Sequence, residues 1–493
     1  MTEEEGARQS PDANSDKKAF GRDVGKLVSG TVVAQVVGII LIPIITRIFG
    51  PEIFGSAAVL LAIISVLTVI SCLLYERAIV LPKEEEDACA IFLACLLILF
   101  FISIIITIVF LLFGDSILVL LNASELAPYM MIVPLLIFID GLYLSFRYWN
   151  TRKKRFGTQA VTQALQSITG SSTKLGFGML GFVNPGSLII GQMIGQIIGT
   201  LILGVQIFRS DIIEIKNSIS IPNIKRQIKR YKKFPLIYTW SELLNALSGT
   251  LPVFLLSSFF TSAIVGFYTL GYQILSLPLG FIGSSIGQVF FQRAAVAKHE
   301  GNLHLLVEDI VSMLITISVV PFSVLTVAGG VLFSVVFGAE WYQAGVFAQI
   351  LALWMLIVFI TNPISTLVSV LEIQEFGLKM NVIIFILRLV TLSIGGVTGN
   401  IYLGLVLFML SGVFFNGYYN YYVVKKSGGS FGKIFHNVKV HLGIAGAVVF
   451  VLLILNIIIQ SSIVIFVLCS VMVIGYEVRL FTKNKQIRGY LFK

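Results

Sequence analysis

Long apolar runs, separated by short polar segments, alternate along almost the whole chain after residue 25. A helix needs about 20 apolar residues to cross the hydrocarbon core of a bilayer, and the pattern supplies fourteen such runs. The predicted fold class is therefore an all-α polytopic membrane protein with about fourteen transmembrane helices. The expected spans are 27–48, 54–74, 88–113, 127–147, 158–182, 186–208, 235–259, 262–288, 308–336, 345–370, 377–396, 400–423, 438–458 and 462–480.

Polar segments divide the chain into five predicted regions. The first 25 residues have no apolar core, which argues for a disordered tail and against a signal peptide. The segment between the sixth and seventh runs contains eight Lys and Arg, and such a cluster stays in the cytoplasm because moving many cations across a bilayer is unfavourable. The expected regions are a disordered cytoplasmic tail (1–25), an N-lobe of spans one to six (26–208), a basic cytoplasmic linker (209–234), a C-lobe of spans seven to twelve (235–424), and spans thirteen and fourteen with a cytoplasmic C-terminus (425–493).

The positive charges agree with this count of spans. If the N-terminus lies inside, all but three of the 35 Lys and Arg fall in or beside segments on that same side. The exceptions are Arg47, Lys174 and Arg388. Because Lys and Arg concentrate in short cytoplasmic loops, we predict a multi-pass protein of the plasma (inner) membrane with both termini in the cytoplasm.

Composition supports the same class and excludes others. The chain is 57% hydrophobic and 12% charged, whereas a soluble domain averages about 25% charged residues. The net charge of +10 does not indicate a nucleic-acid partner, because the cations lie in short loops near anionic headgroups and no soluble module carries a basic face. No loop reaches domain size and no Walker A motif occurs, so we predict a protein that is not an enzyme and is not driven directly by ATP.

No cofactor, metal site or catalytic residue is expected. The acidic run Glu84–Asp87 is better explained as a solvated loop beside a helix start, since a Mg²⁺ site needs converging ligands from a folded cage. The four cysteines lie in or beside spans without CxxC spacing, so neither zinc nor disulfides are implied.

An internal repeat relates the two predicted lobes. Phe49–Gly55 follows the first span and Phe260–Gly266 follows the seventh, each with a glycine at the same offset as it opens a new helix. Six spans per lobe give both lobes the same orientation. We therefore expect a pseudo-twofold axis along the membrane normal, as in transporters with parallel repeats.

Ionisable and amide side chains inside the spans are candidates for a substrate site, because a charge facing lipid is unfavourable by at least about 2.5–3.5 kcal/mol at mid-helix. Lys174 lies mid-span among Gly, Ser and Thr, which permit close helix packing or a wet cavity. The alternative is that these groups only form structural ion pairs or packing hydrogen bonds. The substrate-binding candidates are Lys174, Arg77, Arg47, Asp140 and Gln35, and the candidates for ion coupling or a lobe ion pair are Glu242, Arg388 and Asn245.

Depth within the spans predicts which of these charges meet. At 1.5 Å per residue, Glu242 and Arg388 differ in depth by about 8 Å, which two extended side chains can span. We expect them to pair if spans seven and eleven are neighbours. Asp140 and Lys174 differ by about 15 Å, which leaves Lys174 available for an anion.

Three stretches resemble a known family. Gly25–Gly30, Thr46–Gly55 and Tyr75–Lys83 resemble the polysaccharide-biosynthesis flippases of the Wzx type, in the multidrug/oligosaccharidyl-lipid/polysaccharide exporter superfamily. The resemblance implies a V-shaped protein that moves an undecaprenyl- or dolichol-linked oligosaccharide from the inner to the outer leaflet, for surface polysaccharide or lipopolysaccharide biosynthesis. The partners it implies are the lipid-linked oligosaccharide, membrane lipids and other glycan-assembly proteins.

Other functions stay open at this point. Peptidoglycan-precursor flippases share the fourteen-span layout, but residues 28–45 here contain none of the charges of their first helix. Cation-coupled drug exporters of the same superfamily generally have twelve spans. A membrane-embedded glycan polymerase or ligase normally requires a sizeable external loop, and no such loop is predicted.

Overall fold

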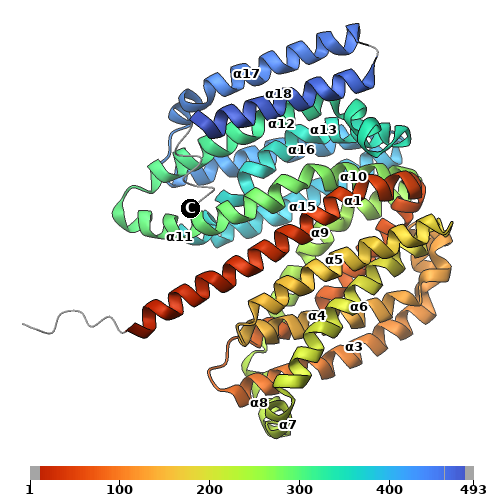
Figure 1. Cartoon of the computed structure of the whole chain (residues 1–493), viewed down its shortest axis with the longest axis vertical. Helices are drawn as coiled ribbons and strands as arrows, with labels where there is room; N and C mark the ends of the chain where they lie inside the picture. The colour runs from red at the N-terminus through yellow and green to blue at the C-terminus, as the bar shows by residue number, and fades with distance from the viewer. Residues whose placement is uncertain (1–10, 460, 484–493) are drawn as a thin grey trace, which may run out of the picture. The chain divides into compact units, whose positions relative to one another are not determined.

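A computed structural model describes residues 11–459 and 461–483 (Figure 1). Side chains are described from residue 36 onward, except at 281, 282, 284, 285, 288 and 483. The regular structure of the described residues is helical throughout, without a β-strand, as the apolar runs predict. The prediction of an all-α polytopic fold is confirmed.

The helices follow the apolar runs, and short 3₁₀ or π turns occur between them. In the first half of the chain they are α1 (Pro11–Ser71), α2 (Tyr75–Ala78), α3 (Glu85–Leu120), η1 (Ser124–Tyr129), α4 (Ile132–Arg152), α5 (Phe156–Met179), α6 (Pro185–Ser210), α7 (Ile212–Asn217) and α8 (Ile221–Arg230). In the second half they are η2 (Phe234–Tyr238), α9 (Thr239–Phe259), α10 (Ser262–Pro278), η3 (Leu279–Gly283), α11 (Ser284–Glu300), α12 (Leu303–Phe337), η4 (Ala339–Trp341), α13 (Tyr342–Ile364), α14 (Leu367–Val370), α15 (Gln374–Val397), α16 (Ile401–Lys426), α17 (Phe431–Ile458) and α18 (Ser462–Lys483).

Each of the fourteen predicted spans coincides with helical structure. Within the described residues, eleven segments are long and apolar enough to cross a membrane. One of these, in α1, covers the first two predicted spans. Two further predicted spans correspond to α5, which is rich in Gly, Ser and Thr, and to α10 with α11, which the turn η3 separates after Pro278.

Helix α1 differs from the sequence prediction at its start and near its middle. It begins at Pro11, so residues 11–25, predicted as a disordered tail, are helical here, while residues 1–10 lie outside the described residues. Proline suits a first helical turn because its fixed φ is already helical and no intrahelical N–H is lost. Near its middle, α1 is kinked at Gly50, whose non-helical φ of 62° and ψ of 169° separate the first two predicted spans.

Contacts between residues divide the chain into two compact units. Unit 1 comprises Met1–Ile48, Leu60–Ile117 and Glu125–Leu247, and unit 2 comprises Phe49–Val59, Leu118–Ser124 and Ser248–Lys493. The boundary in the middle of the chain falls inside α9. The first turns of α9 therefore belong to unit 1, together with α7 and α8.

In unit 1, α5 and α6 pack closely because glycines line their contact. A Cβ on Gly195 would lie 2.7 Å from the carbonyl oxygen of Gln166, and a Cβ on Gly170 would lie 3.3 Å from that of Gly191. Small residues allow helix backbones to approach one another in a membrane protein. At one end of the unit, Trp149 is fully buried against Phe92, with 4.9 Å between the ring centroids.

In unit 2, α12 is the central helix. It packs against α13, α17 and α18. The contact with α13 again uses glycine, since a Cβ on Gly329 would lie 2.7 Å from the carbonyl oxygen of Gly345. The contacts with α17 and α18 form an apolar cluster of Val324, Ala328, Leu452, Ile465 and Cys469.

The two turns of the predicted repeat contact each other within unit 2. A Cβ on Gly55 would collide with the carbonyl oxygen of Ser262, and a Cβ on Gly266 would collide with that of Pro51. The glycine found at the same offset in both turns is therefore required for their close packing.

Candidate functional site

Asp140 is part of a polar network inside unit 1. The Thr68 hydroxyl of α1 donates to its carboxylate at 3.4 Å, and Gln196 of α6 also forms a hydrogen bond to it. Gln166 of α5 donates in turn to the amide oxygen of Gln196. Four helices thus contribute to a continuous set of hydrogen bonds around one carboxylate.

Lys174 lies on the same pair of helices, where α5 and α6 are closest. Its Nζ donates to the amide oxygen of Gln192 at 3.0 Å. A Cβ on Gly191 would lie 3.1 Å from the backbone nitrogen of Lys174, so this cation lies directly on the glycine-lined contact. The ion pairs found among the described residues do not include Lys174. An ammonium group has three donors, and a neutral amide accepts one of them.

Glu242 pairs with Arg77, so the prediction that it pairs with Arg388 is wrong. The Arg77 guanidinium donates to the Glu242 carboxylate at 2.9 Å, and the two side chains are 44% and 36% exposed. The depth expected for Glu242 requires one uniform α-helix over 235–259. In the structure the π turn η2 comes first, and Glu242 lies in the first turn of α9, opposite the short helix α2 that carries Arg77.

Glu76, next to Arg77, is a buried carboxylate. It is 4% exposed, and its Oε2 has no hydrogen-bond partner within the described residues. Burial raises the pKa of Glu76 to about 7, and the nearby charge of Glu242 adds to that rise, while Arg77 opposes it. In the sequence, Glu76 lies just after the second predicted span (54–74), and nothing there indicates that it is buried. Its burial follows from the turn before α2, where Leu73 and Leu74 have φ of 50° and 57°.

Arg388 in unit 2 has neutral partners. Its Nη1 donates to the Ser248 carbonyl oxygen at 2.8 Å and to the Ser248 hydroxyl at 3.1 Å. The guanidinium lies 5.9 Å from the ring centroid of Trp354, within the range of a cation–π interaction. Its Nε is buried without a hydrogen-bond partner in the described part of the chain.

Aromatic rings around Arg388 form a group that the sequence interpretation missed. Trp354 stacks near Tyr272 at 6.2 Å and meets Phe408 edge-on at 4.8 Å. Tyr272 stacks on Tyr268 at 5.9 Å. Aromatic residues within apolar runs look like ordinary core, so no local signal separates them from packing residues.

The remaining predicted site residues lie elsewhere. Arg47 is an exposed side chain of α1, three residues before the Gly50 kink, and Asn245 is an exposed side chain of α9, three residues after Glu242. Gln35 lies in α1, and its side chain is outside those that the structure describes.

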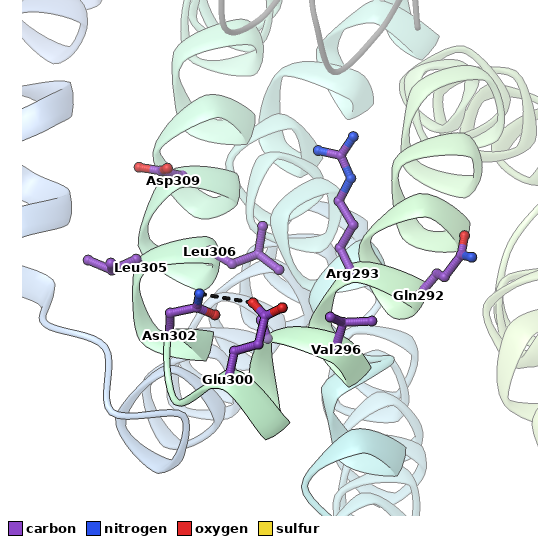
Figure 2. A pocket seen from close by; sticks show the side chains of 9 residues that line it. Gln292, Arg293, Val296, Glu300, Asn302, Leu305, Leu306 and Asp309 are labelled. Carbon is purple, nitrogen blue, oxygen red and sulfur yellow. Dashed lines mark hydrogen bonds between the residues drawn. The ribbon is translucent and has the colours of Figure 1, made fainter. Parts of the chain in front are cut away.

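Unit 2 also contains a pocket between α11 and α12 (Figure 2). Its volume is about 590 Å³. Arg293 and Gln292 extend from α11, Asp309 lies on α12, and the Asn302 amide donates to Glu300 at 3.1 Å where the two helices join (Figure 2). The sequence interpretation had placed Arg293 only among the loop cations.

The fold and these interior charges are those of a polytopic α-helical membrane protein, as expected from the resemblance to the multidrug/oligosaccharidyl-lipid/polysaccharide exporter superfamily. The structure resembles lipid II flippase MurJ in an inward closed conformation, with a TM-score of 0.70 and 12% identity over 92% of this chain and 98% of that one. It also resembles the inward-facing form of a multidrug resistance MATE family transporter of the same superfamily. That TM-score is 0.57, with 16% identity over 80% of this chain and 99% of the other. At these identities the likeness shows the fold alone.

The chain belongs to the polysaccharide biosynthesis protein family, whose model matches residues 44–346. A similar protein is the succinoglycan biosynthesis transport protein ExoT of Rhizobium meliloti (strain 1021), which is 23% identical over 367 residues. The match covers 72% of this chain and 69% of ExoT. The protein is thus a multi-pass membrane protein of a polysaccharide biosynthesis family, as the resemblance in its first 90 residues implied.

Proposed function

We propose that this protein is a flippase that moves a polyprenyl-(pyro)phosphate-linked oligosaccharide from the inner to the outer leaflet of the plasma membrane, with both termini in the cytoplasm. The family match and the transport function named for ExoT support an export step in polysaccharide assembly. The polyprenyl chain of such a cargo can stay in lipid, whereas its anionic and sugar-bearing headgroup needs a polar route. On this proposal the protein makes and breaks no covalent bond in the cargo.

The observation that carries the proposal is Lys174. It is a cation inside unit 1 whose hydrogen-bond partner is the neutral Gln192, 3.0 Å away. Lys174 is half-buried, and a charge withdrawn from water is stable only when it is paired or well hydrogen-bonded, so this ammonium favours the arrival of an anion. A phosphate oxygen would form a charge-assisted hydrogen bond with it. The amides of Gln192, Gln166 and Gln196, on the same two helices, supply donors and acceptors of the kind that sugar hydroxyls need.

Arg77 is a second candidate for phosphate binding in unit 1. Its pair with Glu242 is partly exposed, with 44% and 36% of the two side chains accessible. A phosphate can therefore reach the guanidinium and replace the carboxylate, since Arg binds both groups with the same planar set of donors. Glu242 remains a candidate for ion coupling, because its release from Arg77 would leave it open to a proton or a cation.

The test uses the full chain in sealed vesicles that contain a fluorescent undecaprenyl-diphosphate-linked oligosaccharide, with a membrane-impermeant quencher outside. Lys174→Ala should slow flipping about tenfold or more, because a charge-assisted hydrogen bond of about 1.5–3 kcal/mol is lost. Lys174→Arg should keep part of the rate. The matched control is Lys379→Ala, an exposed lysine near the start of α15, which should flip at the normal rate.

Normal flipping by the Lys174→Ala variant would remove Lys174 from the site. Absence of flipping by the unchanged protein, with this cargo, would contradict the proposed function itself. A recovered oligosaccharide of altered length would identify a polymerase or ligase instead.

A further inference from the structure

The basic segment between α6 and α9 folds into two short helices, α7 and α8, at one end of unit 1 (Figure 1). Two spans flank this segment, ending at Ser210 and beginning at Phe234. The Ser220 hydroxyl accepts from the backbone N–H of Asn223 at 3.5 Å and so caps the start of α8. The segment is therefore an ordered helical element at a membrane surface, since both of its ends continue directly into spans.

Helix α7 is held in place through the carboxylates of Asp211, the residue directly before it, and of Glu214 within it. Arg155 donates to both carboxylate oxygens of Asp211 at 2.6 Å, and the indole N–H of Trp149 donates at 2.9 Å. Burial alone would raise the pKa of Asp211, but these hydrogen bonds outweigh it and lower the pKa. Lys153 donates to Glu214 at 2.9 Å. Both carboxylates of the segment are thus neutralised by cations of the rest of unit 1.

Helix α8 is attached to the rest of unit 1 through one of its faces. The Tyr75 hydroxyl donates to the Ile228 carbonyl oxygen at 3.0 Å, and Arg226 donates to Asp87 at 2.9 Å. Gln227, on the same inner side, is only 1% exposed. Lys225 and Lys229 lie two residues before and after Gln227, about 200° around the helix, so they point away from the rest of unit 1.

The outer surface of the segment combines lysines with isoleucines. The lysines are exposed, and within the described residues their ammonium groups take part in no ion pair or hydrogen bond. Isoleucines are exposed beside them, with Ile213 at 73%, Ile219 at 56% and Ile221 at 66%. We call this surface the linker surface; it consists of Ile213, Lys216, Ile219, Ile221, Lys225, Lys229, Lys232 and Lys233.

We propose that the linker surface binds the anionic phospholipid headgroups of the adjacent leaflet, with its isoleucines inserted at the headgroup boundary. Exposed isoleucine is unfavourable in water but favourable in the acyl boundary, and lysine beside it attracts anionic lipid. With the acids of the segment already paired, its free charge is entirely positive. The proposal uses only the position of the segment between two spans, and it does not depend on which cargo is flipped.

The experiment places an environment-sensitive fluorophore beside the surface. Asn217→Cys, an exposed position at the end of α7, is labelled in the full chain, while the four native cysteines are buried, and the unsubstituted protein gives the background labelling. The protein is inserted in nanodiscs of phosphatidylcholine alone or of phosphatidylcholine with phosphatidylglycerol. We expect about twofold or more higher emission, shifted to the blue, in the anionic discs, and a loss of the difference at high salt.

Two variants make the result specific. Replacing Lys225, Lys229, Lys232 and Lys233 by Gln should remove the difference between the two lipids. The control replaces the exposed Lys425 and Lys426, at the end of α16, by Gln and should leave the difference intact.

Equal emission in both kinds of disc would overturn the proposal. So would an unchanged lipid response after the four lysine substitutions, or a change in emission that occurs only on adding a cytosolic protein extract. None of these readings requires transport, so failure here and failure of the flippase proposal are separate results.

Discussion

In unit 1 the interior cation Lys174 is hydrogen-bonded to one neutral amide, whereas in unit 2 Arg388 is hydrogen-bonded to a carbonyl oxygen and a hydroxyl of Ser248 and lies over Trp354. Among the side chains that the structure describes, the lysine keeps unused donors beside a glycine-lined contact between α5 and α6. The arginine is integrated into the packing of α9, α13 and α15. The two cations, alike in the sequence, therefore have different expected roles: Lys174 in binding an anion and Arg388 in the stability of unit 2.

The carboxylates of the two units differ in the same way. In unit 1, Asp140 lies within a network of hydroxyl and amide groups. In unit 2, Glu308 is buried at 5% exposure and accepts from the backbone N–H of Ser430 at 2.8 Å, directly before α17 begins. A carboxylate at a helix start is favoured by the exposed N–H groups and the helix dipole. Unit 1 thus places polar groups inside its bundle, while unit 2 uses Glu308 to attach a helix.

The largest expected effect on stability is that of replacing Arg388. Arg388→Ala should reduce the free energy of unfolding by about 4 kcal/mol, because it removes charged hydrogen bonds to Ser248 and the contact with Trp354. The measurement is thermal unfolding in detergent with a thiol-reactive dye, since all four cysteines are buried in the folded protein. Lys174→Ala, in the same assay, should change the midpoint much less. A midpoint unchanged by Arg388→Ala would show that the two cations do not differ in this way.

Glu76 should make the stability of unit 1 depend on pH. Its folded pKa of about 7 lies above the ordinary value of 4.5, so the folded protein binds a proton more tightly than the unfolded chain does. The stabilising proton is fully present at low pH and is lost as the pH rises through about 7, which lowers stability by about 3 kcal/mol. Glu76→Gln should remove most of that fall in unfolding curves recorded from pH 5 to pH 8. An equally steep fall in the Gln variant would assign the dependence to another group.

A smaller effect tests the close contact of α5 with α6. Gly195→Ala should destabilise the protein by about 2 kcal/mol, because the added Cβ would lie 2.7 Å from the Gln166 carbonyl oxygen and the helices must separate. The matched control is Gly176→Ala on α5, where a Cβ would meet nothing within 4 Å, and it should be neutral or slightly stabilising. Equal effects of the two substitutions in thermal unfolding would contradict the packing argument.

The smallest expected effect concerns the pair of Arg77 and Glu242. Because both side chains are more than a third exposed, solvent screens the pair, and a double-mutant cycle of unfolding free energies should give a coupling below about 1 kcal/mol. The cycle uses Arg77→Ala, Glu242→Ala and both together. The same cycle for Glu242 with Arg388 should give a coupling near zero. A larger coupling for that second pair would restore the original pairing and place Glu242 with unit 2.

The arrangement of helices could be predicted well from the sequence, because span length is a local property of the chain. Each apolar run long enough to cross a bilayer coincides with helical structure. The differences concern α1, which starts at Pro11 within the predicted tail and in which a kink at Gly50, and no loop, separates the first two spans. A glycine can continue a bent helix or end it, and the choice depends on packing. Here the turn after Gly50 packs against the turn that opens α10.

Side-chain partners were predicted less well, because partners are distant in sequence. Lys174 was recognised as a cation among small residues, but its partner Gln192 depends on how α5 and α6 pack. The pairing of Glu242 with Arg77, 165 residues away, replaces the predicted pairing with Arg388. A count of depth along each helix says nothing about which helices are neighbours, and the π turn before α9 shifts that depth as well.

By itself the sequence determined that this chain is a helical membrane protein of a polysaccharide biosynthesis family, since hydrophobic length, the placement of Lys and Arg and the family stretches are all local properties of the sequence. Only the tertiary structure decided which charges have ionic partners, that Trp354 meets Arg388, and that Glu76 is buried. The reason is physical: crossing a bilayer depends on how many apolar residues follow one another. Burial and pairing depend on which surfaces of separate helices meet, and no stretch of the chain encodes that alone.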